Sequence, residues 1–207
     1  MEDVLDLYEQ VYDPEQPVIC FDEKPVQLLA ETRVPRPLFP GRPRRYDYEY
    51  ERKGTANIFL AVEPLGAWRQ VDVTARRTKV DFARQMQQLV DVHYPRAERI
   101  RVVMDNLNTH KPASLYEAFA PAEARRLLRR LEFHYTPKHA SWLNMAEIEL
   151  SVLSSQCLNR RIADPALLAQ ETTAWQTRRN RDGITVKWRF TVQNARTALP
   201  HLYPQQS

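Results

Sequence analysis

Two apolar segments of the sequence each end in a carboxylate. Ile100–Met104 is short, rich in β-branched residues and almost continuously apolar, and Asp105 follows it directly. Pro17–Phe21 repeats this pattern and leads to Asp22. Such segments are typical of strands buried on both faces, and open α/β sheets bind their ligands at the carboxyl ends of strands. The pattern predicts a site at these carboxylates, although Asp105 could instead cap a helix and Asp22 could bond to a turn.

A third carboxylate is placed by helical spacing. After Ser141, which we expect to cap a helix, apolar residues recur mainly every three or four positions and define one buried face. The residues of this face are Leu143, Ala146, Leu150, Leu153, Cys157 and Leu158. At about 100° per residue, Glu147 falls within the face and Glu149 falls outside it. Because an unpaired buried carboxylate is costly, Glu147 should bind either a metal ion or one of the many arginines.

Three carboxylates, two at strand ends and one on a helix, suit a hard divalent cation such as Mg²⁺. Two such ions about 3.5–4 Å apart can activate an attacking oxygen and stabilise a leaving one in phosphoryl transfer. The sequence has no phosphate-binding loop, dinucleotide-binding glycine pattern, Gly-x-Ser-x-Gly motif or zinc-ligand spacing that would indicate other chemistry. The polar residues expected to support the ligands, rather than bind the metal, are Asn106, His110, His139 and Asn144.

Basic segments indicate a polyanionic partner. Lysine and arginine number 30 against 26 acidic residues, and the formal net charge is +4. One proline-rich segment without acidic residues carries Arg33, Arg36, Arg42, Arg44 and Arg45. We expect an extended loop that contacts phosphates, with a solvated linker as the alternative. Near the carboxyl end, Lys187 and Arg189 alternate with Trp188 and Phe190. This pattern could contact phosphates and stack on bases, or the two aromatic side chains could pack in the core.

The remaining composition favours a cytoplasmic protein. No apolar stretch is long enough to span a membrane, and Met1–Asp3 is acidic where a signal peptide would be basic. Cys20 and Cys157 lie in apolar surroundings without metal-ligand spacing, as expected of core thiols in a reducing compartment.

The order of the elements predicts an α/β fold. Residues 1–16 should form a short helix and a linker. Alternating patterns predict strands at 46–52 and 55–64, with Lys53 and Gly54 turning the chain, and a further strand at 68–74. A helix with a capping box at Thr78 and Asp81 then leads to the strand before Asp105. This strand-helix-strand succession is typical of a parallel pair. Later helices should begin at Pro121 and Pro165, around a short strand at 133–135.

Three segments resemble the catalytic blocks of a known family. Val18–Glu23, Val103–His110 and His139–Glu147 resemble those of the DDE transposases of bacterial insertion sequences related to the mariner superfamily. The most specific part is Ser-Trp-Leu-Asn, followed two residues later by a glutamate. The similarity continues to Trp188–Thr191 and covers nearly the whole chain. In this resemblance the acidic triad is Asp22, Asp105 and Glu147.

The resemblance implies a ribonuclease H-like fold at residues 17–207, with a mixed five-stranded sheet, three antiparallel strands followed by two parallel ones, and helices on both faces. It implies two Mg²⁺ or Mn²⁺ ions, cleavage and transfer of double-stranded DNA at transposon ends, a homodimer in the DNA complex, and association with the nucleoid. The N-terminal helix-turn-helix region usual in this family is expected to be separate or missing. The alternatives are a metal-dependent nuclease that only hydrolyses DNA, and a DNA-binding or assembly protein that has lost catalysis.

Overall fold

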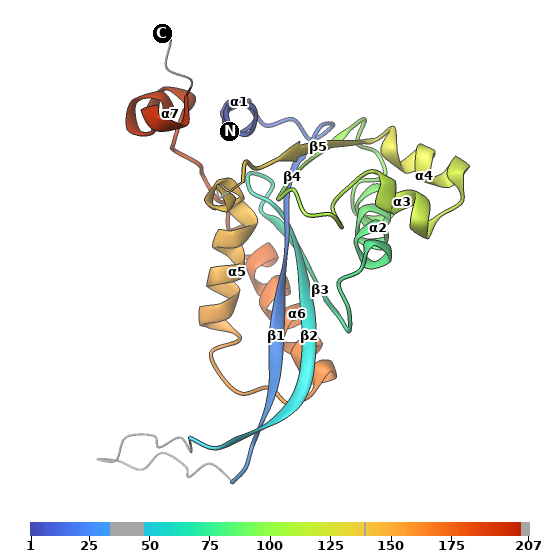
Figure 1. The fold of residues 1–207 in the computed structure, drawn as a ribbon, viewed down its shortest axis with the longest axis vertical. Coiled ribbons are helices and arrows are strands. Elements are labelled where there is room, and N and C mark those ends of the chain that lie inside the picture. Colours follow the sequence, from blue (N-terminus) through green and yellow to red (C-terminus); the bar gives the residue numbers. More distant parts are fainter. Residues whose placement is uncertain (34–47, 139, 204–207) are drawn as a thin grey trace.

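The computed structural model describes residues 1–33, 48–138 and 140–203. One sheet with the strand order β3-β2-β1-β4-β5 runs through the molecule (Figure 1). The strands are β1 (Val18–Glu31), β2 (Tyr50–Glu63), β3 (Trp68–Thr74), β4 (Ile100–Met104) and β5 (Leu131–Tyr135). β2 is antiparallel to both β1 and β3, whereas β4 is parallel to β1 and β5 is parallel to β4. The predicted succession of three antiparallel strands and two parallel ones is confirmed.

The long hairpin of β1 and β2 differs from the prediction at one point. The sequence suggested two strands separated by a turn at Lys53 and Gly54, but β2 is a single strand that pairs with β1 on both sides of this position. Leu28 lies opposite Gly54 and Leu29 lies opposite Arg52, so Lys53 is an extra residue in β2. Gly54 has φ 109°, a conformation open to glycine, and the chain therefore accommodates the extra residue as a bulge instead of turning.

Helices cover both faces of the sheet (Figure 1). Their bounds are α1 (Glu2–Glu9), α2 (Lys79–Gln88), α3 (Ala113–Ala118), α4 (Pro121–Leu128), α5 (Met145–Gln156), α6 (Pro165–Arg181) and α7 (Val192–Ala198). A π-helical turn at Leu89–His93 continues α2, and short 3₁₀ turns lie at Ser141–Leu143 and Pro200–Leu202.

Alternation along β1 separates two cores. Cys20 packs with residues of α1, α5, α6 and α7 on one face, whereas Phe21 packs with residues of α2, α3 and α4 on the other. This follows from the geometry of a strand, in which successive side chains point to opposite faces. The next residue on the α5 side is Asp22, and the next on the α2 side is Glu23. A strand buried on both faces thus presents one carboxylate to each layer.

Helix caps determine where the segments around the site begin. Thr78 and Asp81 form the predicted capping box of α2, and Asp164 caps α6 as expected. The prediction of Ser141 as the cap of the next helix is wrong. Ser141 opens a 3₁₀ turn, and α5 starts only at Met145, with the Asn144 side chain accepting a hydrogen bond of 3.1 Å from the Ala146 amide.

No helix within the described part of the chain is long and apolar enough to cross a membrane. Both cysteines are free; Cys20 is buried and Cys157 is partly buried.

Candidate active site

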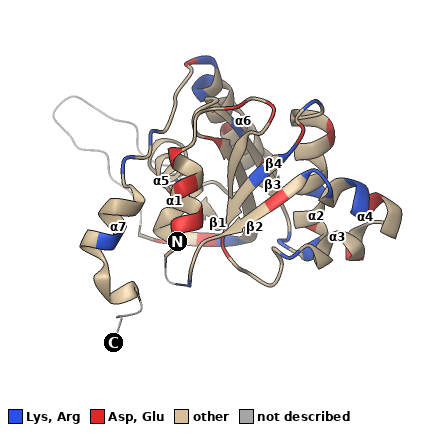
Figure 2. Cartoon of the chain, turned by 90° about the horizontal axis from the view of Figure 1, so that it is seen from above, with Lys and Arg blue, Asp and Glu red and all other residues tan. Residues whose placement is uncertain are grey.

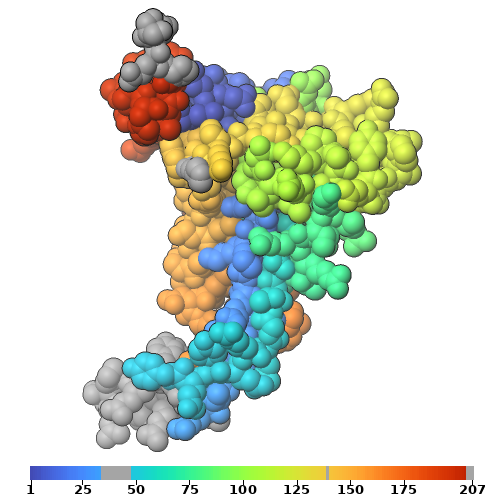
Figure 3. Space-filling view, viewed as in Figure 1, coloured from blue at the N-terminus to red at the C-terminus, as the bar shows by residue number. Residues whose placement is uncertain are grey.

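The candidate site lies where β4 ends while β1 continues. The parallel pairing of the two strands runs from Val18 opposite Arg101 to Cys20 opposite Val103. Extending this register by two residues places Asp22 opposite Asp105, the residue that follows β4. Figure 3 shows atoms of β1 (blue) between α5 (orange) and the green segment that contains α2. Asp105 follows the end of β4 as predicted, but the prediction that Asp22 ends a strand is wrong, because β1 continues to Glu31. Asp22 and Asp105 are therefore neighbours at the edge of the short strand, on the side of α5.

Asp22 is half-buried, and its electrostatic surroundings link it to both other predicted ligands. The pKa of Asp22 is raised to about 7, chiefly by burial and also by the nearby carboxylates of Glu23, Asp105 and Glu147, against a hydrogen bond from the Glu23 amide that lowers it. That hydrogen bond reaches Asp22 Oδ1 over 2.8 Å. Asp22 is thus close enough to Asp105, after β4, and to Glu147, on α5, for both charges to act on it. The three predicted ligands therefore lie in the same neighbourhood.

The His110 side chain contacts the Asp105 carboxylate. Its Nδ1 lies 2.6 Å from Asp105 Oδ1, and its Nε2 makes an ionic contact of 3.0 Å with Glu23 Oε2. The His110 side chain is 1% exposed and packs between the rings of Phe21 and Phe82. Burial alone would lower the pKa of His110, but Asp105 and Glu23 outweigh it and raise the pKa to about 9. The imidazole is therefore cationic at neutral pH and lies between two carboxylates.

Glu23 is a site residue that the sequence did not single out. It alternates with Asp22 along β1, so its side chain lies on the other face of the sheet. Glu23 nevertheless acts on the site through His110, which reaches it on the α2 side of the sheet. Arg77 Nη1 also lies 3.7 Å from Glu23 Oε1. No spacing in the sequence predicts the contact between Glu23 and His110, because the two residues are far apart in the chain.

The other predicted supporting residues have different outcomes. Asn144 is 1% exposed, and its Nδ2 donates a hydrogen bond of 2.9 Å to the Phe21 carbonyl oxygen. It therefore attaches the start of α5 to β1, immediately before Asp22, instead of bonding to a carboxylate. Asn106 is exposed and accepts a hydrogen bond from Lys111. His139 lies outside the described residues.

The helical phase predicted for α5 is wrong by part of a turn. The buried residues of α5 are Met145, Ala146, Glu149, Leu150 and Leu153. Glu149, predicted to lie outside the buried face, is 1% exposed, whereas Glu147 is only half-buried at the edge of that face. The predicted face included Leu143 and Leu158, and these two residues moved it towards Glu147. In the structure neither belongs to the helix, because Leu143 precedes α5 and Leu158 follows it.

Glu149 also has the cationic partners that were considered for Glu147. Arg69 of β3 binds its two carboxylate oxygens at 2.7 and 3.1 Å, and Arg179 of α6 binds them at 3.1 and 2.8 Å. Arg69 is 0% exposed. Burial acts to raise the pKa of Glu149, but the two guanidinium groups outweigh it and lower the pKa. This cluster joins α5 to β3 and α6, and it leaves Glu147 free to face Asp22.

The donor chemistry of the triad suits a hard divalent cation, but its side chains do not enclose one in this arrangement. Within the described ranges, no group of three His, Cys, Asp or Glu side chains is gathered closely enough to hold a metal ion. Like charges repel, and Asp105 is turned towards His110. Burial is the main cause of the raised pKa of Asp22, and the carboxylates of Glu23, Asp105 and Glu147 add to it. A bound divalent cation would favour the ionised carboxylate.

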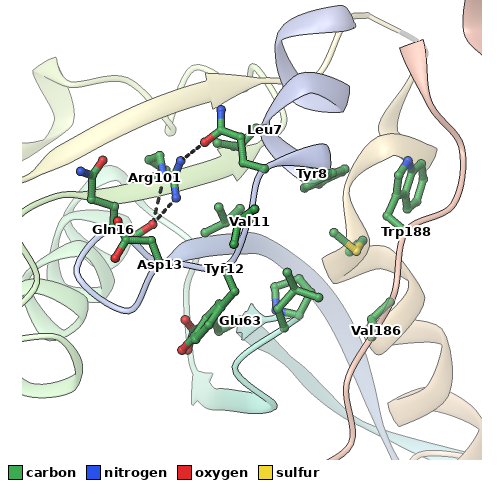
Figure 4. Close-up of a pocket in the computed structure, with 15 residues that line it drawn as sticks. Leu7, Tyr8, Val11, Tyr12, Asp13, Gln16, Glu63, Arg101, Val186 and Trp188 are labelled. Atoms are coloured by element: carbon green, nitrogen blue, oxygen red, sulfur yellow. Dashed lines mark hydrogen bonds between the residues drawn. The ribbon is translucent and has the colours of Figure 1, made fainter. Parts of the chain in front are cut away.

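The pocket in Figure 4 is distinct from this site. It is lined by Val18 and Arg101, at the starts of β1 and β4, together with Tyr8, Glu63 and Trp188. Arg101 Nε donates a hydrogen bond of 3.0 Å to the Gln16 carbonyl oxygen there. None of the three predicted ligands lines this pocket, which lies at the amino ends of the parallel strands, away from Asp22 and Asp105.

The predicted DNA-contact residues are only partly described. Arg36, Arg42, Arg44 and Arg45 lie outside the described residues, and Arg33 is exposed beyond the end of β1. Lys187 and Arg189 are exposed, whereas Trp188 and Phe190 are half-buried and pack against the core on the α5 side. Figure 2 shows other Lys and Arg residues (blue) on several elements, among them α4 and α7. For Trp188 and Phe190, packing in the core is therefore the interpretation that the structure supports.

A family model described as DDE superfamily endonuclease matches residues 17–168. The chain belongs to this superfamily. The match begins just before β1 and includes Asp22, Asp105 and Glu147. No curated protein sequence matches the chain.

Solved structures with the same fold are complexes of the Mos1 mariner transposase. A Mos1 mariner paired end complex with Mn has a TM-score of 0.58 and 14% sequence identity over 88% of this chain and 55% of that one. The Mos1 strand transfer complex has a TM-score of 0.55 and 14% identity over 88% of this chain and 54% of that one. These similarities confirm the predicted ribonuclease H-like fold. The chain spans about half the length of the Mos1 chains that it matches.

Proposed function

We propose that this chain is the catalytic domain of a DNA transposase of the mariner type, encoded by an insertion sequence, which cleaves DNA strands at transposon ends and joins them to target DNA. The observation that carries the proposal is the position of Asp22, Asp105 and Glu147 in one neighbourhood beside the end of β4, within a DDE superfamily domain. In each step an oxygen nucleophile, water or a 3′-hydroxyl, forms a new bond to phosphorus while the bond to the leaving oxygen breaks.

In this proposal Asp22, Asp105 and Glu147 hold two Mg²⁺ or Mn²⁺ ions. When bound, such ions lower the pKa of the attacking water or hydroxyl and neutralise charge on the leaving oxygen. The carboxylates of Asp105 and Glu147 near Asp22 support this assignment, because both raise its pKa and a divalent cation would offset their charge. A Mos1 paired end complex contains Mn, which agrees with the same choice of ion.

The residues around the triad position it. His110 fixes the direction of the Asp105 carboxylate, and Glu23 fixes His110 from the α2 side of the sheet. Asn144 attaches the start of α5 to β1, and the cluster of Glu149 with Arg69 and Arg179 sets the rotation of α5. Because a misplacement of about 1 Å can cost on the order of 100-fold in rate, these contacts matter to catalysis without touching DNA.

The proposed partners are double-stranded DNA of transposon ends and target, and a second copy of the chain in the DNA complex. Solved Mos1 structures include a paired end complex and a strand transfer complex, which supports DNA as the partner. We further propose that a separate helix-turn-helix region recognises the terminal repeats, because phosphate contacts by Lys187, Arg189 and the predicted arginine-rich loop carry no sequence information.

The experiment is a strand-cleavage and joining assay on labelled duplexes that carry the element's ends, with Mg²⁺ or Mn²⁺. Asp22→Asn, Asp105→Asn and Glu147→Gln should each abolish cleavage and leave the circular dichroism spectrum unchanged. The matched controls Asp182→Asn and Glu98→Gln alter exposed residues of the same types and should retain activity. Activity in all three triad variants would refute the proposal, and cleavage without joining by the unaltered chain would favour a hydrolytic nuclease.

A further inference from the structure

Trp142 is an exposed aromatic side chain held on a fixed support. It is 41% exposed. Its ring stacks on Trp188, with centroids 6.2 Å apart and an interplanar angle of 19°, and meets Phe190 edge-on at 5.5 Å. Trp188 in turn packs against Tyr8 and donates a hydrogen bond of 2.7 Å from Nε1 to the Phe190 carbonyl oxygen. One side of the Trp142 indole is thus supported by the core while another part faces solvent.

The backbone that follows Trp142 is anchored by two contacts. Leu143 is 0% exposed, and its carbonyl oxygen accepts a hydrogen bond of 2.9 Å from the Tyr8 hydroxyl. Asn144 donates its hydrogen bond of 2.9 Å to Phe21, the residue before Asp22. Two residues span at most about 7 Å of extended chain, so the backbone of Trp142 lies near the segment that carries Asp22. The indole itself stacks on Trp188, which also lines the pocket at the amino ends of the parallel strands.

Exposed cations lie close to Trp142 and its aromatic neighbours in the chain. Residues 136–146 and 183–203 contain no aspartate or glutamate, although Glu2 and Glu9 of α1 bond to Arg196 and to the Val192 amide. Lys138, Lys187 and Arg189 within these segments are exposed. An exposed aromatic ring with cations on neighbouring residues is the combination that binds single-stranded nucleic acid, since the cations follow the phosphates and the ring stacks on a base.

We infer that Trp142 is a stacking site for an unpaired nucleobase of the DNA bound at the triad. The inference rests on the proposed function in that DNA is the substrate. Bases inside a duplex are covered by their neighbours on both faces, so only a base at a strand end or outside the stack can lie on the indole. A stacked base at this position would hold the strand end close to Asp22 and Asp105.

The test measures binding of fluorescent DNA to the full chain by anisotropy, with EDTA present to prevent cleavage. The probes are a blunt duplex, duplexes with 3′ or 5′ single-stranded overhangs, and the same overhangs with one abasic site at each position in turn. The unaltered chain should bind one of the overhangs roughly tenfold more tightly than the blunt duplex, and an abasic site at one position should abolish this preference.

Variants test the same point from the protein side. Trp142→Ala should lose the preference for the overhang and retain binding to the blunt duplex, whereas Trp142→Phe should keep part of the preference. Tyr116→Ala, which removes a 48% exposed aromatic on α3, is the control and should bind as the unaltered chain does.

The abasic probes decide the question even if Trp142→Ala fails to fold. If intact and abasic overhangs bind the unaltered chain equally, only phosphates are contacted and the inference is wrong. In that case, binding to the blunt duplex would still agree with the proposed function. If the chain binds none of the probes, both proposals are wrong.

Discussion

Replacing Glu149 with glutamine should destabilise the fold far more than the same change at Glu147. The carboxylate of Glu149 is the shared partner of Arg69, which is 0% exposed, and Arg179, whose side chain is 14% exposed. Glutamine keeps the size of the side chain and removes its charge. Arg179 can then recover part of its hydration, but Arg69 stays buried without that ionic partner.

Removing one partner of a buried ion pair costs about 3–5 kcal/mol, and we expect Glu149→Gln to lower the free energy of unfolding by this amount. For a chain of this length each kcal/mol corresponds to roughly 2–4 °C, so the melting temperature should fall by about 6–20 °C. Glu147→Gln removes a half-buried charge from a crowded carboxylate group and should change stability by less than about 1 kcal/mol.

Urea unfolding followed by circular dichroism measures both changes, and equal slopes would show that only stability differs. The double variant Arg69→Met with Glu149→Leu is the control, because apolar residues of similar volume can replace a buried ion pair with little loss. A cost below about 1 kcal/mol for Glu149→Gln would refute the assignment of the cluster as the contact that fixes α5.

Three further predictions concern charge at the site and on the surface. The folded pKa of Asp22 is about 7, against 3.8 for an ordinary aspartate, so folding becomes less favourable as pH rises between these values. Asp22→Asn should therefore stabilise the metal-free chain at pH 8 and not at pH 4. Equal urea midpoints of the two proteins at pH 8 would contradict this. Titrating Mn²⁺ or Mg²⁺ should raise the melting temperature of the unaltered chain and raise it less in Asp22→Asn; a flat response would argue against metal binding. Changing Arg42, Arg44 and Arg45 together to alanine should weaken binding to all duplexes alike and flatten its salt dependence, as measured by anisotropy at several salt concentrations; a strong preference of the unaltered chain for the terminal repeat would reveal a sequence-reading element within it.

Local sequence determined the strands that carry Asp22 and Asp105. The apolar run of Ile100–Met104 is a strand buried on both faces, and Asp105 follows it as predicted. Such a run has one stable environment, between two layers, and its first polar residue must lie at the edge. The capping box at Thr78, which predicted the start of α2, and the Ser-Trp-Leu-Asn block, which pointed to Glu147 in the first turn of α5, are equally local signals.

Tertiary structure decided which glutamate of α5 is buried and what holds Asp105. Periodicity assumes that each apolar residue belongs to the helix, but Leu143 lies in the preceding 3₁₀ turn, and the error moved the predicted face away from Glu149. The partners of Glu149 come from β3 and α6, and Glu23 meets His110 only because β1 and the segment after β4 are neighbours in the sheet. A charged side chain is tolerated in a core only where it forms ion pairs with opposite charges. Here those charges come from other elements, so the ion pairs exist only in the folded chain.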